Sequence, residues 1–261
     1  MNVSLVSIIP FACFVLLFIL QSLLPRRPLN KSGHRRIIHN LFLFIVNSVL
    51  MRFIVPIGLV AVAAHTNLNE WGLLGALGAS QPFAIAFSVL LCVIALDFAI
   101  YWQHVATHKW NVLWRLHKVH HADHDMDVTT AIRFHPIELI LSLLYKSVVV
   151  VLLGAPVLAV VIFELLLFVG PAFNHSNLAL PSWLDAKFRL FIATPDVHRA
   201  HHSTKIGEQN TNYGFFLIWW DKLFGTYTKA PEEGHVEMAI GLKDSSQRYE
   251  KVDEMLLAPF R

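Results

Sequence analysis

Long apolar stretches constrain this chain more than any other feature of its sequence. Three of them are long enough to cross a bilayer as a helix, at residues 4–24, 41–64 and 82–103. About 20 apolar residues span the hydrocarbon core of a membrane. Charged residues make up only 15% of the chain, against about 25% in ordinary soluble domains. The sequence therefore predicts an integral membrane protein and excludes a water-soluble enzyme.

Two apolar stretches carry interruptions that bear on their structure. The second contains Arg52, and a charge is costly in lipid, so either Arg52 faces the interior of the bundle or the first part of the stretch lies at the interface. A fourth stretch, residues 137–170, is broken by Gly154-Ala155-Pro156. As one helix it would be about 50 Å long, too long for a single crossing. We expect a short or re-entrant hairpin of two helices of about 15 residues, which returns the chain to its starting side.

The basic residues predict which side of the membrane each loop occupies. Residues 25–39 carry five Lys and Arg, whereas residues 65–81 carry none, and cytoplasmic loops are enriched in Lys and Arg. The third span then returns the chain to the cytoplasm at His104, where residues 171–261 form a cap with charges at intervals. We also expect residues 4–24 to be a retained anchor, because they lack a basic n-region and a small-residue cleavage site.

Histidine is the second unusual feature, with 15 residues in the chain against 18 Asp and Glu. Eight of them fall into three boxes whose spacing places imidazoles on one face of a helix. The boxes are HVATH (His104, His108), HKVHH (His117, His120, His121) and HRAHH (His198, His201, His202). Crowded neutral imidazoles satisfy their lone pairs by binding metal. Eight ligands exceed what one ion takes, so the boxes predict two metal ions, provided that the hairpin brings the boxes to one side.

Other metal and catalytic patterns are absent from the sequence. Di-iron bundles of the carboxylate type need two Glu-x-x-His pairs, and the chain has only Glu232 with His235. No HExxH, Walker or nucleophile-elbow motif occurs. Cys13 and Cys92 lie inside apolar runs, which excludes a disulfide framework. The formal charge of +3 comes without a nucleic-acid-binding motif, so no nucleic acid is expected as a partner.

At these boxes the sequence resembles the fatty acid hydroxylase superfamily, also called the sterol desaturase family, of integral membrane di-iron oxygenases. The resemblance covers about residues 95–228, including the strings DFAIYWQH, HHADHDMD, TAIRFHPIE, TPDVHRAHH and NTNYGFFLIWWDKLFGTY. It implies that the eight box histidines are iron ligands. Members commonly recruit further histidines between the second and third boxes, and His175 in NHSN and His135 in RFHP are the candidates. The alternative for His135 is a structural cap where the hairpin begins.

Polar neighbours of the boxes are candidates for supporting roles. Asp97 and Tyr101 fall on the same helical stripe as the first box, and a ligand histidine usually donates its second nitrogen to a carboxylate or carbonyl. Asp97 is therefore a candidate hydrogen-bond partner, with Asp123 and Asp196 as alternatives beside the other boxes. Asn212 is a candidate supporting residue of the cap.

The sequence thus predicts an all-α fold, an integral membrane bundle of three spans plus a short helical hairpin, with a cytoplasmic helical cap that carries the His boxes. Residues 1–103 would form the N-terminal transmembrane region and residues 104–261 the catalytic region. In a bacterium the membrane would be the inner membrane.

The resemblance implies an O2-dependent oxidoreductase that hydroxylates or desaturates a C–H bond of an apolar lipid. It implies two iron ions, for which zinc can substitute in purified protein. Haem, ferredoxin and dinucleotide motifs are absent, so electrons would come from a separate donor such as a ferredoxin or cytochrome b5 with its reductase. The basic residues Lys109, Arg115 and Lys118 are a candidate surface for that donor, and the alternative for these charges is a solvated surface that faces the membrane. A non-redox membrane metalloprotein, either a zinc hydrolase or a metal transporter, is the alternative.

Overall fold

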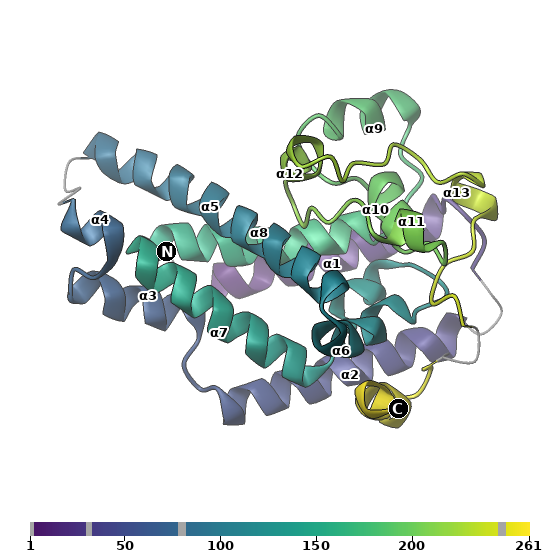
Figure 1. Ribbon diagram of the computed structural model, residues 1–261, viewed down its shortest axis with the longest axis horizontal. Helices are drawn as coiled ribbons and strands as arrows, with labels where there is room; N and C mark the ends of the chain where they lie inside the picture. The colour runs from purple at the N-terminus through teal and green to yellow at the C-terminus, as the bar shows by residue number, and fades with distance from the viewer. Residues whose placement is uncertain (1–2, 30–32, 78–81, 245–248) are drawn as a thin grey trace.

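The computed structural model describes residues 3–29, 33–77, 82–244 and 249–261, in which no β-strand occurs (Figure 1). Residues 30–32 and 78–81 of the two predicted loops lie outside the described residues. The membrane part contains α1 (Val3–Leu23), α2 (Gly33–Ile54), α3 (Leu59–Leu68), α4 (Gly72–Ala76), α5 (Pro82–Lys109), α7 (Pro136–Leu153) and α8 (Val157–Asn174). The cap contains α6 (Asn111–His121), η1 (Val128–Ile132), α9 (Ser182–Phe188), α10 (Pro195–His201), α11 (Ile206–Gln209), α12 (Trp219–Leu223), α13 (Gly234–Glu237), α14 (Val252–Leu257) and η2 (Ala258–Phe260). The predicted all-α fold is confirmed.

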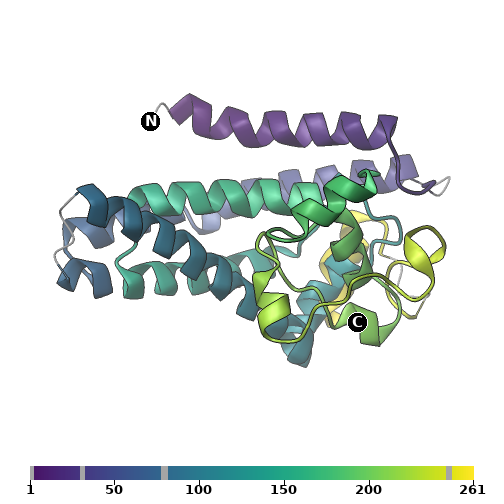
Figure 2. The ribbon, with the colours of Figure 1, turned by 90° about the horizontal axis from the view of Figure 1, so that it is seen from above.

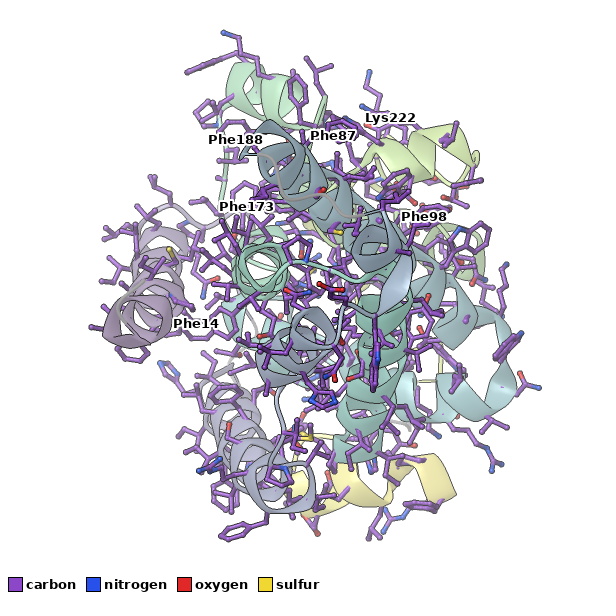
Figure 3. The ribbon with its side chains drawn as sticks, turned by 90° about the vertical axis from the view of Figure 1, so that its left-hand side faces the viewer. Phe14, Phe87, Phe98, Phe173, Phe188 and Lys222 are labelled. Atoms are coloured by element: carbon purple, nitrogen blue, oxygen red, sulfur yellow. The ribbon has the colours of Figure 1, made fainter. Side chains whose placement is uncertain are left out.

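The long helices have the length and hydropathy of membrane spans. Four segments meet both criteria: Gly33–Ala76, Ile85–Lys109, Pro136–Leu153 and Val157–Asn174. The first helix, α1, lies along one side of the bundle (Figure 2). It packs against α8, where the rings of Phe14 and Phe168 are 6.2 Å apart, and Phe14 points inward from α1 (Figure 3). The predicted membrane bundle is therefore confirmed.

The second apolar stretch differs from the single span predicted over residues 41–64. Helix α2 begins earlier, at Gly33, and ends at Ile54, and the chain resumes as α3 at Leu59. Pro56 lies in the break, where it lacks a backbone N–H and disfavours a helical conformation in the preceding residue. Arg52 lies in the last turn of α2 with its side chain exposed. The alternative in which Arg52 faces the bundle interior is therefore wrong.

The hairpin forms as predicted, but its helices are longer than expected. Helices α7 and α8 have 18 residues each and join at Gly154-Ala155-Pro156, so each is about 27 Å long, close to the thickness of a bilayer core. Gly154 has φ +67° and its Cα lies against the chain after α3, where an added Cβ would come within 2.5 Å of the carbonyl oxygen of Trp71. Asn67 on α3 donates to the carbonyl of Ala155 at 3.0 Å and accepts from the N–H of Val157 at 3.2 Å.

The hairpin returns the chain to the cap, so several helix ends meet there (Figure 1). The C-terminal ends of α5 and α8 and the N-terminal end of α7 all face the cap. Between these ends and the hairpin turn, α3, α5, α7 and α8 share an apolar core. It includes Leu59, Ala63, Leu96, Ile100, Val150, Val160 and Phe163. This packing fixes the position of the box on α5 relative to the residue that follows α8.

A buried ionic network joins α2 to the segment after α6. Arg36, in the predicted basic loop, lies instead in α2, where it donates to Asp123 at 2.7 Å and also pairs with Asp127. Asn40, one turn further, donates to Asp123 at 3.1 Å and accepts from Arg133 at 3.0 Å. Burial acts to raise the pKa of Asp123, but the guanidinium groups of Arg36 and Arg133 outweigh it and hold that pKa below its usual value. The network holds the second histidine box against the bundle.

The hairpin turn gives a test of this packing. We expect Gly154→Ala to lower the melting temperature of the detergent-solubilised protein clearly more than Gly225→Ala, measured by thermal loss of the monodisperse peak. Both glycines have positive φ, +67° and +71°, so both substitutions add the strain of a left-handed conformation, about 1–2 kcal/mol. Only Gly154 adds a clash with backbone, because nothing lies within 4 Å of a Cβ on Gly225. Equal losses for the two variants would contradict the close approach of the turn to Trp71.

Candidate metal centre

Nine histidines converge in two groups at the cap end of the bundle. Site A consists of His104, His108, His117, His121 and His201, and site B of His120, His175, His198 and His202. Within each group the candidate ligand atoms lie within 4.8 Å of one another. The structure thus brings together all eight box histidines and His175. Their role as metal ligands stays a prediction.

Each HxxHH box contributes to both sites, because consecutive residues of a helix point in directions about 100° apart. On α6 the first and third histidines of the box belong to site A, and the second, His120, belongs to site B. On α10 the assignment is reversed, and the second histidine, His201, belongs to site A. The HxxxH pair of α5 completes site A. His175, the C-cap residue of α8, completes site B.

Backbone carbonyls determine which nitrogen carries the proton in two rings of site A. His104 Nδ1 lies 2.7 Å from the carbonyl oxygen of Tyr213, and His201 Nδ1 lies 2.7 Å from that of Thr211. A carbonyl only accepts, so each Nδ1 donates, and the Nε2 of each neutral ring carries a lone pair. The two Nε2 atoms are 3.0 Å apart. Two lone pairs therefore face each other in a buried space, an arrangement that a cation between them would stabilise.

His175 has the same role in site B. Its Nδ1 donates to the carbonyl of Pro171 at 2.8 Å, so its Nε2 also carries a lone pair. Three further Nε2 atoms surround it, those of His120 at 3.0 Å, His198 at 3.1 Å and His202 at 3.2 Å. Two nitrogens bound to one ion at about 2.1 Å, at angles from a right angle to tetrahedral, lie about 3.0–3.4 Å apart. The spacing is that of a coordination shell.

Burial keeps the rings neutral and leaves several nitrogens without hydrogen bonds. The pKa of His201 falls to about 3 and that of His175 to about 4, mainly because burial disfavours the charged form. Among the described residues, the Nε2 atoms of His108, His117 and His121 are buried with no hydrogen-bond partner. Each such atom costs about 1–3 kcal/mol. Neutral imidazoles with free lone pairs suit Fe, Zn, Cu or Ni, so the donor set fits metal ions at both sites.

Glu138 is a supporting residue that sequence reasoning missed. Its Oε1 lies 2.6 Å from His117 Nδ1, and the pair is buried. The carboxylate accepts a hydrogen bond from the Nδ1–H of His117, so the Nε2 of that ring is directed into site A. Glu138 lies in the first turn of α7, as the last residue of the HPIE string, but no spacing rule connects it to a histidine 21 residues earlier on a different helix. Only the packing of α7 against α6 reveals the contact.

The carbonyl that accepts from His104 of site A lies in a loop that Asp221 organises. Asp221 accepts from the backbone N–H of Tyr213 at 2.8 Å and of Gly214 at 2.7 Å. The Thr226 hydroxyl donates to it at 2.7 Å. Burial raises the pKa of Asp221 to about 6, although these hydrogen bonds act against the shift. By fixing this loop, Asp221 fixes the carbonyl that holds His104.

The predicted supporting residues have other partners than the box histidines. Asp97 accepts from Trp220 Nε1 at 2.7 Å, and the Tyr101 hydroxyl lies 3.0 Å from Thr226 Oγ1. Asp196 pairs with Arg26 at 3.0 Å and with Arg199. Asn212 donates to the carbonyls of Val197 and Thr228 at 2.8 and 2.9 Å. Asp97 and Tyr101 connect α5 to α12 and its neighbouring loop, and Asp196 connects the cap to Arg26 after α1, whereas Asn212 joins segments within the cap.

His135 lies outside both sites. Its Nδ1 accepts from the backbone N–H of Ile137 at 3.2 Å, which caps α7. Its Nε2 therefore carries the proton and donates to the carbonyl of Leu256 at 3.2 Å. Both ring nitrogens are used within the protein, as the alternative of a structural cap predicts.

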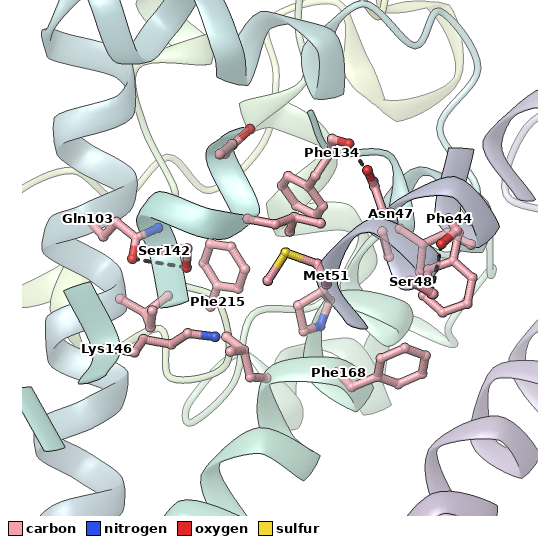
Figure 4. A pocket seen from close by; sticks show the side chains of 17 residues that line it. Phe44, Asn47, Ser48, Met51, Gln103, Phe134, Ser142, Lys146, Phe168 and Phe215 are labelled. Carbon is pink, nitrogen blue, oxygen red and sulfur yellow. Dashed lines mark hydrogen bonds between the residues drawn. The ribbon is translucent and has the colours of Figure 1, made fainter. Parts of the chain in front are cut away.

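An apolar cavity of about 350 Å³ adjoins the two sites within the bundle (Figure 4). Its lining includes Glu138, which holds His117, and Pro171, whose carbonyl holds His175. Phe134 also lines it and stacks on His120 with ring centroids 4.6 Å apart. The cavity therefore reaches side chains that contact site A and side chains that contact site B.

A second cavity, of about 360 Å³, opens on the cap side and is lined mainly by polar residues. It reaches His108 of site A and includes Asn111, Asn210 and Lys243. Of the three basic residues predicted to form a donor surface, Lys109 and Arg115 are exposed. Lys118 is buried and donates to the carbonyl oxygen of Arg261 at 3.4 Å. The prediction that Lys118 forms part of that surface is therefore wrong, because the residue lies on the inner face of α6.

Comparisons with known proteins agree on one family. A family model described as fatty acid hydroxylase matches residues 89–226. The ornithine lipid hydroxylase OlsE of Rhizobium tropici is 30% identical over 201 residues, which are 68% of this chain and 60% of that protein. Alkylglycerol monooxygenase of Danio rerio is 32% identical over 162 residues, 59% of this chain and 33% of that protein. A very-long-chain aldehyde decarbonylase, GL1-5, of Oryza sativa subsp. indica is 27% identical over 145 residues, 52% of this chain and 22% of that protein.

The chain thus spans less than two thirds of the length of each of these relatives. No protein of solved structure matches it.

The contact between Glu138 and His117 can be tested by metal content. We expect Glu138→Ala to lower the metal affinity of the purified protein by about 10- to 100-fold. Metal sites typically lose this much affinity when the group that accepts a hydrogen bond from the second ring nitrogen of a ligand histidine is removed. Chelator competition followed by elemental analysis measures the change. Glu164→Gln on α8 is the matched control, an acidic residue of the bundle outside both sites. An unchanged metal content in Glu138→Ala would show that the carboxylate does not support site A.

Proposed function

Because the chain belongs to the fatty acid hydroxylase family, we propose that it is an O2-dependent membrane oxidoreductase that hydroxylates or desaturates a C–H bond of an apolar lipid. The observation that carries the proposal is the pair of Nε2 lone pairs of His104 and His201, 3.0 Å apart and buried. Together with the four converging nitrogens of site B, they favour two metal ions held side by side. The names of the relatives, all of which act on lipids or long-chain aldehydes, support a lipid substrate.

We assign one iron ion to each site, with five histidines in site A and four in site B. Zinc accepts the same ligands, so zinc in purified protein is compatible with the proposal. When bound and reduced, the iron ions would supply the activation of O2 that oxidation of an unactivated C–H bond requires.

The residues of the chain prepare the site for this chemistry. The carbonyls of Tyr213, Thr211 and Pro171 hold three imidazoles with Nε2 directed inward, so the ligands need not reorganise when a metal ion binds. Glu138 does the same for His117. The cavity beside the sites has a mostly apolar surface, which disfavours water and can orient a hydrocarbon chain toward the histidines.

Electrons would come from a separate donor protein, such as a ferredoxin or cytochrome b5 with its reductase. The polar cavity at His108 supports an approach from the cap side. The exposed Lys109 and Arg115 lie near it in sequence and suit an acidic partner. The positive charge of residues 25–39 supports a cytoplasmic location for the cap.

The proposal is tested by turnover in the purified protein. We expect the protein loaded with Fe(II), supplied with reductant, donor and lipid extract, to consume O2 and to form an oxidised lipid. His120→Ala and His201→Ala should abolish this turnover and lower bound metal while the protein still inserts in membranes. His34→Ala, an exposed residue at the start of α2, is the control and should retain activity.

Wild-type turnover in either site variant would refute the ligand assignment. Metal-dependent hydrolysis of lipid without O2 consumption would instead favour a hydrolase. Comparison of the lipids of a deletion strain with those of a complemented strain identifies the substrate.

A further inference from the structure

Helix α7 carries a polar stripe on a face that lines the apolar cavity. Glu138, Ser142 and Lys146 follow one another at intervals of four residues, which places them on one face of the helix. All three line the cavity, and Ser142 and Lys146 are labelled in Figure 4. From Glu138 to Lys146 the stripe is about 12 Å long. It begins at the carboxylate that holds His117 and ends inside the membrane-spanning part of α7.

Lys146 ends this stripe with a charge that lacks a contact partner. Its ammonium group points into the cavity (Figure 4). Among the described residues, no hydrogen bond and no ion pair within 4.0 Å involves its Nζ. Glu164 on α8 is the acidic group that acts on it electrostatically, without reaching salt-bridge distance. Lys146 therefore differs from buried cations such as Arg36, Arg133 and Arg199, which make direct ionic or hydrogen-bonded contacts.

A lysine in this position has an energetic cost that calls for a compensating group. Charged side chains within membrane spans are rare, face cavities or the bundle interior and pair with an opposite charge. Most of the cavity lining around Lys146 consists of apolar side chains such as Met51, Leu167 and Phe168. These side chains can surround a hydrocarbon chain but cannot balance an ammonium group. An anion within the cavity would supply what the protein lacks.

We propose that Lys146 binds the carboxylate of an anionic single-chain lipid in this cavity. A carboxylate carries one charge and matches one ammonium group, whereas a phosphate needs more donors than the stripe offers. The volume of about 350 Å³ is near the lower end for ligand cavities and fits one chain rather than two. Bound in this way, the chain extends along the stripe from Lys146 toward the histidines. The direction of the chain rests on the proposed function, because a chain that runs from Lys146 to the histidines has its oxidised carbon about 12 Å from the carboxylate.

The experiment measures binding by displacement of tritiated palmitate from the purified full-length chain in detergent. Unlabelled palmitate, methyl palmitate and hexadecyl phosphate serve as competitors. For the wild type we expect palmitate to displace the label at a concentration at least about tenfold lower than methyl palmitate, because a charge-assisted contact in an apolar site is worth that much or more. Palmitate should also displace the label better than hexadecyl phosphate.

Substitution of Lys146 should remove this preference selectively. In Lys146→Met we expect palmitate and methyl palmitate to displace the label at nearly equal concentrations. The concentration required for methyl palmitate should be the same as in the wild type. Lys146→Arg should keep the preference, as should Lys229→Met, which removes an exposed lysine of the cap. If Lys146→Met is not monodisperse, Lys146→Gln carries the same expectation, because it removes the charge and retains a polar end.

Three outcomes would overturn the proposal. A wild type without preference for palmitate over its methyl ester shows that the cavity holds no anion. An unchanged preference in Lys146→Met or Lys146→Gln shows that the anion binds elsewhere and that Glu164 alone balances Lys146. Stronger displacement by hexadecyl phosphate refutes the carboxylate. The assay contains no reductant or donor, so a failed oxygenase assay with intact Lys146-dependent binding refutes the proposed function alone, and the reverse result refutes the carboxylate site alone.

Discussion

Neutral imidazoles that face one another across about 3 Å are the arrangement on which this structure depends. The rings of His104 and His201 direct lone pairs at each other because backbone carbonyls hold the protons on the opposite nitrogens. Burial depresses the pKa of His201 to about 3, so protonation does not relieve the repulsion at neutral pH. A cation bound between the two Nε2 atoms relieves the repulsion between their lone pairs. The surrounding protein can be understood as the framework that keeps such an arrangement in place.

That framework is built from helix ends that meet at one side of a membrane bundle. The hairpin of α7 and α8 returns the chain to the cap and places His175 beside the boxes of α6 and α10. The turn at Gly154 and the contacts of Asn67 fix the far end of this hairpin. At the near end, the buried ions around Arg36 hold the segment after α6. Fixed helix ends and the loop organised by Asp221 then set the directions of the rings.

Helix α7 links the metal centre to the membrane interior. Its first turn supplies Glu138, whose carboxylate holds a ligand candidate, and the same face continues through Ser142 to Lys146 along the cavity. Polar groups are costly at this depth unless they are paired. Glu138 is paired with His117, whereas Lys146 has no contact partner among the described residues. One helix face thus combines the support of the metal site with the recognition that we propose for a lipid.

The sequence alone determined the membrane bundle, the hairpin and the eight box histidines, because hydropathy and the i, i+3, i+4 spacing are local properties of the chain. It offered both His175 and His135 as further candidates, and only the structure separated them. Only the tertiary structure decided which histidine belongs to which site, since neighbouring rings of one box point in different directions. It also decided the partners of the boxes. Glu138 contacts a different helix, and backbone carbonyls carry no residue signature. Asp97 and Lys118 contact Trp220 and Arg261, partners that the sequence pattern does not indicate, because packing determines what each face of a helix meets.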